Sequence, residues 1–325
     1  MVPSLLIYII MSRQDFMSQP LLREFFYFFM GWKIVEIENA DRLRLFLDNL
    51  VIYKEEDKII IPINDIDTLI IDNVQINLSI QLINKLSENN VNVIICNEKH
   101  LPNTQLLPII GNYNALKVLN KQLEWNHKYK SNLWKKLVVQ KIDNQIEILS
   151  FFGYYNDNVK IMNELKNEVK EYDITNREGH AAKIYWHTLF GREFNRRDEE
   201  NPINKYLNYG YAILRSYFSK SIVKKGLDPR ISIFHKSFHN HFALASDLME
   251  VFRIIIDFEV IKIVEVEKMQ KPWYESKQQL IELFNRRILV DGKEQFINNA
   301  IDLFLEAIIA ERELPTLVFP MYEWN

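Results

Sequence analysis

The spacing of apolar residues divides the chain into two parts. Between Lys33 and Cys96, apolar and polar residues alternate over short segments, with the period of two that half-buried β-strands have. One segment departs from this pattern, because Ile80, Ile83 and Leu86 recur at helical spacing. We therefore predict a small β-rich domain with one helix. Its strands are expected at residues 33–37, 42–47, 51–53, 58–62, 68–71 and 91–96, and its helix at 79–88.

From residue 114 onward, apolar residues recur every three or four positions, which is the period of amphipathic helices. One predicted helix has clear end signals: Asn201 and Pro202 suit its start, and Gly226 suits its end. The second part is therefore predicted to be all-α. Its helices are expected at residues 114–152 (as one helix or two), 159–172, 178–190, 202–225, 242–256, 274–287 and 293–312, the last two separated by a turn at Asp291-Gly292.

The predicted fold class is α+β and multidomain. Pro102, Pro108 and Gly111 interrupt the pattern between the two parts, which indicates an interdomain linker. The working protein is expected to start at Met30, with the preceding stretch an extension that is not part of the fold. The expected order is extension 1–29, β-rich domain 30–100, linker 101–112 and larger all-α domain 113–325.

Composition changes this picture little. The chain has 48% hydrophobic and 26% charged residues, which is ordinary for a globular protein. Its net charge is −3, but residues 205–253 carry eight Lys/Arg against three acids, a local excess that suits a polyanion. A single cysteine, Cys96, excludes an intrachain disulfide and a Cys-based zinc site. With no apolar segment long enough to span a bilayer, we expect a cytoplasmic protein without a membrane contact.

Three places along the chain carry candidate chemistry. Asp247 and Glu250 are three residues apart, so they share one face of an otherwise apolar helix. Carboxylates beside a buried stripe are costly unless they are paired, hydrogen-bonded or bound to metal. Glu178 begins another predicted helix. His235 follows the segment at residues 226–229 that ends the predicted helix 202–225. Two or three carboxylates and one imidazole suit Mg²⁺ or Mn²⁺, with coordination positions left for water or phosphate oxygens.

Each of these residues also has an interpretation without metal. Thr175 and Glu178 have the spacing of a capping box, in which the glutamate serves only the helix start. Asp247 and Glu250 have Arg253 and Lys236 as possible salt-bridge partners on a solvated face. His235 is one of three histidines that are close in sequence and could form a loop cluster without metal. Spacing alone leaves these alternatives open. The sequence has no Gly-rich phosphate loop, no His-Glu-x-x-His and no Gly-x-Ser-x-Gly motif.

At these residues the sequence resembles the CRISPR-associated integrases (CRISPR-associated protein one), in their type II branch. The likeness runs from Met30 to near the C-terminus, and the order of β-rich and helical domains is also the family's order. Val251, Ile254 and the approach to His235 at residues 231–234 depart from the family pattern in packing rather than in chemistry. The matching stretches are residues 30–32 (MGW), 177–186 (REGHAAKIYW), 206–215 (YLNYGYAILR), 226–229 (GLDP) leading to His235, and 240–253 (NHFALASDLMEVFR).

The resemblance implies a function and a site. The chain would be a metal-dependent DNA endonuclease and integrase of antiviral defence, which joins 3′-hydroxyl ends of short DNA fragments into the CRISPR repeat array. Glu178, His235 and Glu250 would be both catalytic residues and ligands of Mg²⁺ or Mn²⁺, and Asp247 would be a supporting acid. Candidate phosphate contacts are Arg177, Arg215, Lys236 and Arg253.

The resemblance also implies partners. The β-rich domain would form a homodimer, and two dimers would flank a dimer of a small ferredoxin-like adaptation partner in a four-plus-two complex. Further type II adaptation factors and the effector nuclease would take part. The alternatives are a generic metal-dependent DNA nuclease that cuts without joining, and a non-catalytic helical scaffold that binds DNA or protein. A di-iron carboxylate bundle is disfavoured because such bundles use two Glu-x-x-His motifs, and the chain lacks that pair of motifs.

Overall fold

The computed structural model describes residues 7–10, 33–108, 112–155, 157–235 and 239–324, and the chain divides into two compact units between Gly111 and Asn112. The order of a β-rich unit followed by a largely helical one confirms the predicted fold class. No helix in the described part of the chain is long and apolar enough to cross a membrane.

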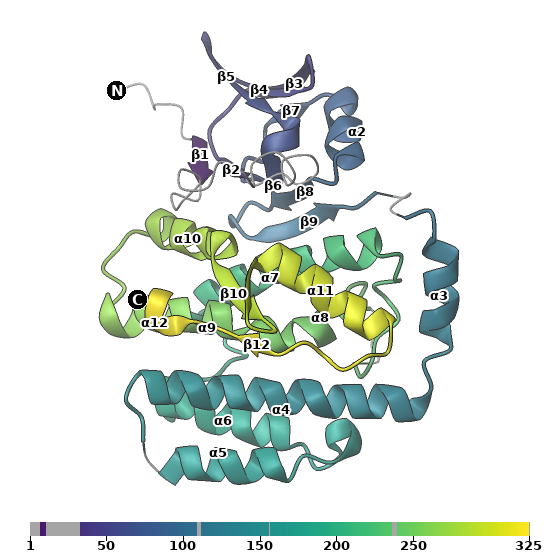
Figure 1. Cartoon of the computed structure of the whole chain (residues 1–325). Coiled ribbons are helices and arrows are strands. Elements are labelled where there is room, and N and C mark those ends of the chain that lie inside the picture. Colours follow the sequence, from purple (N-terminus) through teal and green to yellow (C-terminus); the bar gives the residue numbers. More distant parts are fainter. Residues whose placement is uncertain (1–6, 11–32, 109–111, 156, 236–238, 325) are drawn as a thin grey trace. The chain divides into compact units, whose positions relative to one another are not determined.

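The first unit contains a five-stranded sheet with a parallel centre (Figure 1). β2, β6 and β8 pair in parallel, and β1 and β9 add antiparallel edges. All six residues of β6 are buried, as expected for a central strand covered on both faces. The strands in sheet order are β1 (Ile7–Ile10), β2 (Lys33–Ile37), β6 (Ile66–Ile71), β8 (Asn92–Cys96) and β9 (Pro102–Leu106).

A second sheet of four strands completes this unit. Leu47 and Asp48 form the two-residue turn between β3 and β4, and both have positive φ angles, as the tight hairpin turn demands. Apolar residues of both sheets and of helix α2 form one core, which includes Val35, Leu43 and Leu82. The elements are β3 (Arg42–Phe46), β4 (Asn49–Lys54), β5 (Asp57–Pro62), β7 (Asn77–Leu78), the short 3-10 helix η2 (Ile63–Asp65) and α2 (Ile80–Glu88).

Two expected boundaries differ from the structure. Ile7–Ile10 lies within the stretch that we expected outside the fold, yet it forms β1 and pairs with β2. The reason is that β2 would otherwise present an unpaired edge, which an apolar segment can cover. Pro102–Leu106, expected in the linker, is strand β9. Pro102 is tolerated there because β9 is an edge strand and the proline is its first residue.

The second unit is built on helices. α4 (His127–Phe151) lies against α5 (Asp157–Asn167) and α6 (Arg177–Phe190) (Figure 1). α7 (Pro202–Lys224) is buried over most of its circumference, which places it in the middle of the core. A Cβ at Gly210 of α7 would lie 2.5 Å from the Ile256 side chain, so glycine is required for the close approach of α9. The remaining long elements are α3 (Ala115–Leu123), α8 (Ala243–Leu248), α9 (Ile254–Ile261), α10 (Trp273–Glu282) and α11 (Ile297–Ile309).

The predicted helices 274–287 and 293–312 were wrong at two ends, the C-terminal end of the first and the N-terminal end of the second. Those ends form a hairpin of β10 (Arg287–Val290) and β11 (Lys293–Phe296). Asp291 and Gly292 have φ angles of 49° and 76°, the paired positive values of a two-residue hairpin turn, and this turn chemistry overrides the helical spacing. The short elements of this unit are β12 (Leu317–Val318), α12 (Met321–Trp324), η3 (Glu171–Asp173), η4 (Met249–Phe252), η5 (Lys262–Val266) and η6 (Leu283–Asn285).

Candidate metal centre

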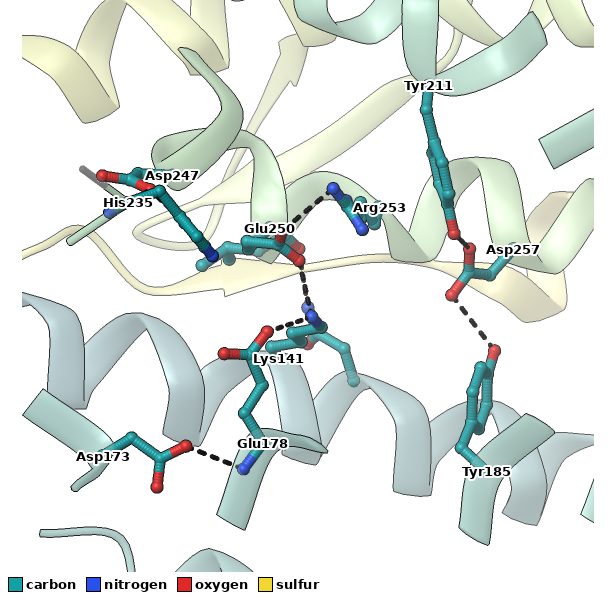
Figure 2. Close-up of polar contacts among 12 residues, drawn as sticks. Lys141, Asp173, Glu178, Tyr185, Tyr211, His235, Asp247, Glu250, Arg253 and Asp257 are labelled. Carbon is teal, nitrogen blue, oxygen red and sulfur yellow. Dashed lines mark hydrogen bonds and ion pairs between the residues drawn. The ribbon is translucent and has the colours of Figure 1, made fainter. Parts of the chain in front are cut away.

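His235 is held by the buried carboxylate of Asp247. The His235 ring nitrogen Nδ1 lies 2.6 Å from Asp247 Oδ1, and Asp247 Oδ2 accepts hydrogen bonds of 2.8 Å from the backbone N–H groups of Ile233 and Phe234. One carboxylate therefore fixes both the loop and the imidazole. Figure 2 shows the ring reaching from Asp247 toward Glu250, so its other nitrogen, Nε2, faces the carboxylates of the centre. A carboxylate behind a histidine in this way is typical of metal-binding histidines.

The hydrogen bond that the His235 ring donates to the Asp247 carboxylate raises the pKa of His235. Burial of the ring opposes this effect, and the charges of Asp247, Glu178 and Glu250 reinforce it. The side chain of His235 is 48% exposed, so the ring can be reached from solvent.

Aromatic side chains pack against the His235 loop. Phe234 stacks on the buried Trp134 of α4 with ring centroids 4.4 Å apart, and the His235 ring meets the same indole edge-on at 5.3 Å. Gln122 adds a polar clamp, because its side chain binds the backbone of Asp228 and Ile231 with distances of 2.8–3.1 Å. These contacts fix the course of the loop before any ligand binds.

Glu178 lies in the first turn of α6, but it does not cap that helix. Asp173 does so, because its carboxylate accepts hydrogen bonds from the N–H groups of Arg177 (2.8 Å) and Glu178 (2.9 Å). Thr175 Oγ1 is buried without a hydrogen-bond partner. The capping-box interpretation was therefore wrong, and the Glu178 side chain is free to point toward the centre (Figure 2).

This difference between two neighbouring residues gives a prediction. Asp173→Ala should lower the free energy of unfolding by about 1–2 kcal/mol, because two N–H groups at the start of α6 lose their acceptor. Thr175→Ala should change it by less than about 0.5 kcal/mol, since Thr175 Oγ1 makes no bond to lose. Urea unfolding of both variants measures this, and equal losses would contradict the assignment of the cap.

Glu250 lies in the short 3-10 helix η4 between α8 and α9, with a side chain only 6% exposed. Both of its carboxylate oxygens have a cationic partner: Arg253 is 2.9 Å from Oε1, and Lys141 of α4 is 2.7 Å from Oε2. Lys141 also makes an ion pair with Glu178 (Figure 2). Burial opposes ionisation of Glu250, but Arg253 and Lys141 outweigh it and hold its pKa below the usual value. Glu250 therefore does pair with Arg253, as one of the alternatives without metal predicted. The pair is nearly buried, however, and not on a solvated face.

The donor set fits a divalent cation. Glu178, His235 and Glu250 offer two carboxylates and one imidazole, which suit Mg²⁺ or Mn²⁺. Their ligand atoms do not all lie within 4.8 Å of one another, since the one such group among the described residues is Glu36, Glu38 and Asp72 of the first unit, which our sequence analysis did not predict. In the centre itself, the Lys141 ammonium stands between the two glutamates.

Another buried carboxylate, Asp257, lies in α9 close to the centre. It accepts hydrogen bonds from the hydroxyls of Tyr211 and Tyr185, the latter at 3.3 Å (Figure 2). Burial raises the pKa of Asp257 to about 6, although Tyr211 and Arg253 act in the opposite direction. Arg253 also lies over the Tyr211 ring, 4.6 Å from its centroid, and this cation–π contact fixes the guanidinium beside Glu250.

A cavity of about 740 Å³ opens beside these residues. Lys141, Glu250 and Arg253 form one part of its lining, together with Asp257 and Tyr211. The rest of the lining is rich in cations and aromatic rings, so the cavity suits a phosphate chain with attached bases. The cationic and aromatic residues of this second part are Lys183, Trp186, Arg192, Phe194, Arg196 and Arg197.

Among the predicted phosphate contacts that the structure describes, Arg253 is the one that lines this cavity. Arg177 instead makes an ion pair with Glu168 at 2.8 Å. Arg215 lies over the ring of Phe242, 5.7 Å from its centroid, and Lys236 lies outside the described residues.

Sequence reasoning missed several residues of the centre. The arginines of the α6–α7 connection had a signal, because residues 192–197 carry three of them. Lys141 also had a signal in the sequence. It follows the buried Leu137 by four positions and so falls on the apolar face of its helix. Asp257 interrupts an apolar run of α9, which is the same kind of signal.

The fold and the centre together define a protein with two carboxylates and an imidazole, a donor set that fits a divalent metal, at the edge of a basic, aromatic cavity. Residues 36–298 match the family model described as "CRISPR associated protein Cas1". The chain belongs to this family.

A curated relative agrees with this assignment, and solved structures share the fold. The CRISPR-associated endonuclease Cas1 of Neisseria meningitidis serogroup C (strain 8013) is 32% identical over 283 residues, which cover 86% of this chain and 92% of the relative. A casposase bound to integration product has a TM-score of 0.69 and 22% identity, covering 86% of this chain and 91% of its own. A Cas6-RT-Cas1–Cas2 complex has a TM-score of 0.69 and 17% identity, covering 86% of this chain and 35% of its own. The two structures support the fold.

Proposed function

We propose that this chain integrates new spacers into a CRISPR array of the type II branch, with Glu178, His235 and Glu250 as its metal ligands. The chain is a Cas1-family, metal-dependent DNA endonuclease and integrase. The observation that carries the assignment of residues is the Asp247–His235 pair, which aims an imidazole at two glutamates beside a basic cavity. The reaction is a transesterification, in which a 3′-hydroxyl of a short DNA fragment attacks a phosphodiester at the repeat.

Mg²⁺ or Mn²⁺ would be held by Glu178, His235 and Glu250, where it supplies a lowered pKa for the attacking hydroxyl and charge neutralisation for the phosphate. The protein's own groups do the rest. Asp247 keeps the Nδ1 side of His235 occupied, so that Nε2 remains a ligand atom. Arg253, held over Tyr211, faces the phosphate oxygens, and the arginines of the cavity bind the strand that follows.

The assembly is part of the proposal. The β-rich unit would form a homodimer, and two such dimers would flank a dimer of the small ferredoxin-like partner, in four-plus-two proportions. The family's proteins work with Cas2 and DNA. We place the reaction in the cytoplasm, together with the other type II adaptation factors.

The test is a joining reaction on a supercoiled plasmid that carries the repeat array. Purified protein and its small partner are incubated with a labelled fragment that has free 3′-hydroxyls, in Mn²⁺ or Mg²⁺ or with a chelator. We expect label to enter the plasmid only with metal, and not when the fragment has 3′-dideoxy ends.

The two rival functions predict other outcomes. A generic nuclease nicks the plasmid in a metal-dependent way but never transfers label, with or without the partner. A non-catalytic scaffold does neither, although it retains DNA binding. Either result from a folded, assembled complex would overturn the proposal.

A further inference from the structure

Lys141 occupies the position between the two glutamates that a metal ion needs. It comes from the middle of α4, its side chain is 12% exposed, and its Nζ atom contacts Glu178 Oε1 and Glu250 Oε2. The two carboxylates come from different elements, α6 and η4, so this ammonium group is a direct link between them.

The ammonium and a divalent cation exclude each other. Two positive charges about 4 Å apart in a partly buried site repel by several kcal/mol. Both oxygens of Glu250 already have a cationic partner, so a metal can bind this carboxylate fully only if one partner withdraws. The ligand atoms of Glu178, His235 and Glu250 do not all lie within 4.8 Å of one another, which agrees with a site where an ammonium group rather than a metal ion joins the two glutamates.

Of the two partners, Lys141 is the one that can leave. Arg253 is held both by Glu250 and by the Tyr211 ring. Lys141 has a flexible four-carbon stem, and the described residues give it no ion pair other than those to the two glutamates. The same lysine lines the cavity of about 740 Å³, which offers space for the displaced side chain.

We propose that Lys141 is an internal stand-in cation, which holds Glu178 and Glu250 together in the metal-free protein and swings into the cavity when the metal binds. The inference rests on the proposed metal site. It makes Lys141 a positioning residue: it holds the paired carboxylates in place, at a cost in metal affinity. In the metal-bound protein, its ammonium adds to the positive lining of the cavity.

The first test measures Mn²⁺ affinity of the full chain by the electron paramagnetic resonance signal of free Mn²⁺. If the lysine fills the site in about nine molecules of ten, Lys141→Met should tighten binding about tenfold, because the competent fraction rises to one. Lys183→Met is the matched control. It removes the same charge from the same cavity, where no ion pair to either glutamate exists, and should change affinity less than about twofold.

The second test uses the unmodified sequence, so it decides the matter even if Lys141→Met does not fold. The protein is acetylated briefly with an N-hydroxysuccinimide ester, with and without Mn²⁺, and the lysines are quantified by peptide mass spectrometry. We expect acetylation of Lys141 to rise several-fold with Mn²⁺, because the displaced amine loses its carboxylate partners, and acetylation of Lys183 to stay constant.

The outcomes separate this inference from the proposed function. If His235→Ala binds Mn²⁺ as tightly as the wild type, the metal site itself is wrong. If His235→Ala binds weakly, but Lys141→Met leaves affinity unchanged or weakens it, the metal site stands and the stand-in role is overturned. Metal-independent acetylation of Lys141 would overturn that role as well.

Discussion

Replacing His235 with alanine is expected to lower the rate of fragment joining by about 10³-fold, provided that the metal site is as proposed. The imidazole is one of three ligand groups, and several kcal/mol of transition-state stabilisation depend on the metal. At pH 8.5, where the contribution of the pair with Asp247 is smallest, stability should change little, because the ring is 48% exposed and Asp247 keeps its three backbone donors. The measurement is the initial rate of label transfer into the array plasmid at saturating Mn²⁺.

His180→Ala is the matched control for this prediction. His180 is an exposed histidine of α6 that lies outside the centre, so its loss should leave the joining rate within about twofold of the wild type. An unchanged rate for His235→Ala, in a protein that still assembles with its partner, would remove His235 from the ligand set.

Replacing Asp247 with asparagine should damage both stability and activity. We expect the free energy of unfolding to fall by about 2–4 kcal/mol, because an amide accepts fewer of the four hydrogen bonds and brings its own N–H groups toward donors. Joining should fall about 10- to 100-fold, the usual effect of losing the carboxylate behind a metal-bound histidine. Urea unfolding and the plasmid reaction measure the two effects. Asp143→Asn is the control, since Asp143 makes a surface pair with Lys166.

The stability loss should also depend on pH in the metal-free protein. Asp247 raises the pKa of His235 above its value in the unfolded chain, so this pair stabilises the fold fully below about pH 6.5. The contribution disappears as the pH rises through the folded pKa. The difference between wild type and Asp247→Asn should therefore be larger at pH 5.5 than at pH 8.5. A difference that grows with pH would contradict the Asp247–His235 pair.

The residues of the centre were predictable where a local pattern marks them. Asp247 and Glu250 are unusual as acids in an apolar helix, and the likeness to the integrase family selected Glu178 and His235 with them. The structure places the Asp247 carboxylate behind the His235 ring and turns Glu178 and Glu250 toward one lysine. The roles of the three metal ligands remain a proposal.

The cap of α6 shows where local patterns fail. Thr175 and Glu178 have capping-box spacing, but Asn176 has a φ angle of 52°, in the left-handed region, which turns the chain so that Asp173 reaches the first N–H groups instead. The spacing of residues did not contain this backbone turn. This turn decides whether the Glu178 side chain caps α6 or points toward the centre.

The sequence by itself determined the type of most elements, the order of the two units and the residues with unusual chemistry. These depend on interactions within a few positions: apolar periodicity, end signals and paired acids one helical turn apart. Only the tertiary structure decided that Lys141 joins Glu178 to Glu250 and that Arg196 and Arg253 line one cavity. Such contacts link residues far apart in the chain, and their energy depends on burial and exact neighbours, which a local pattern does not contain.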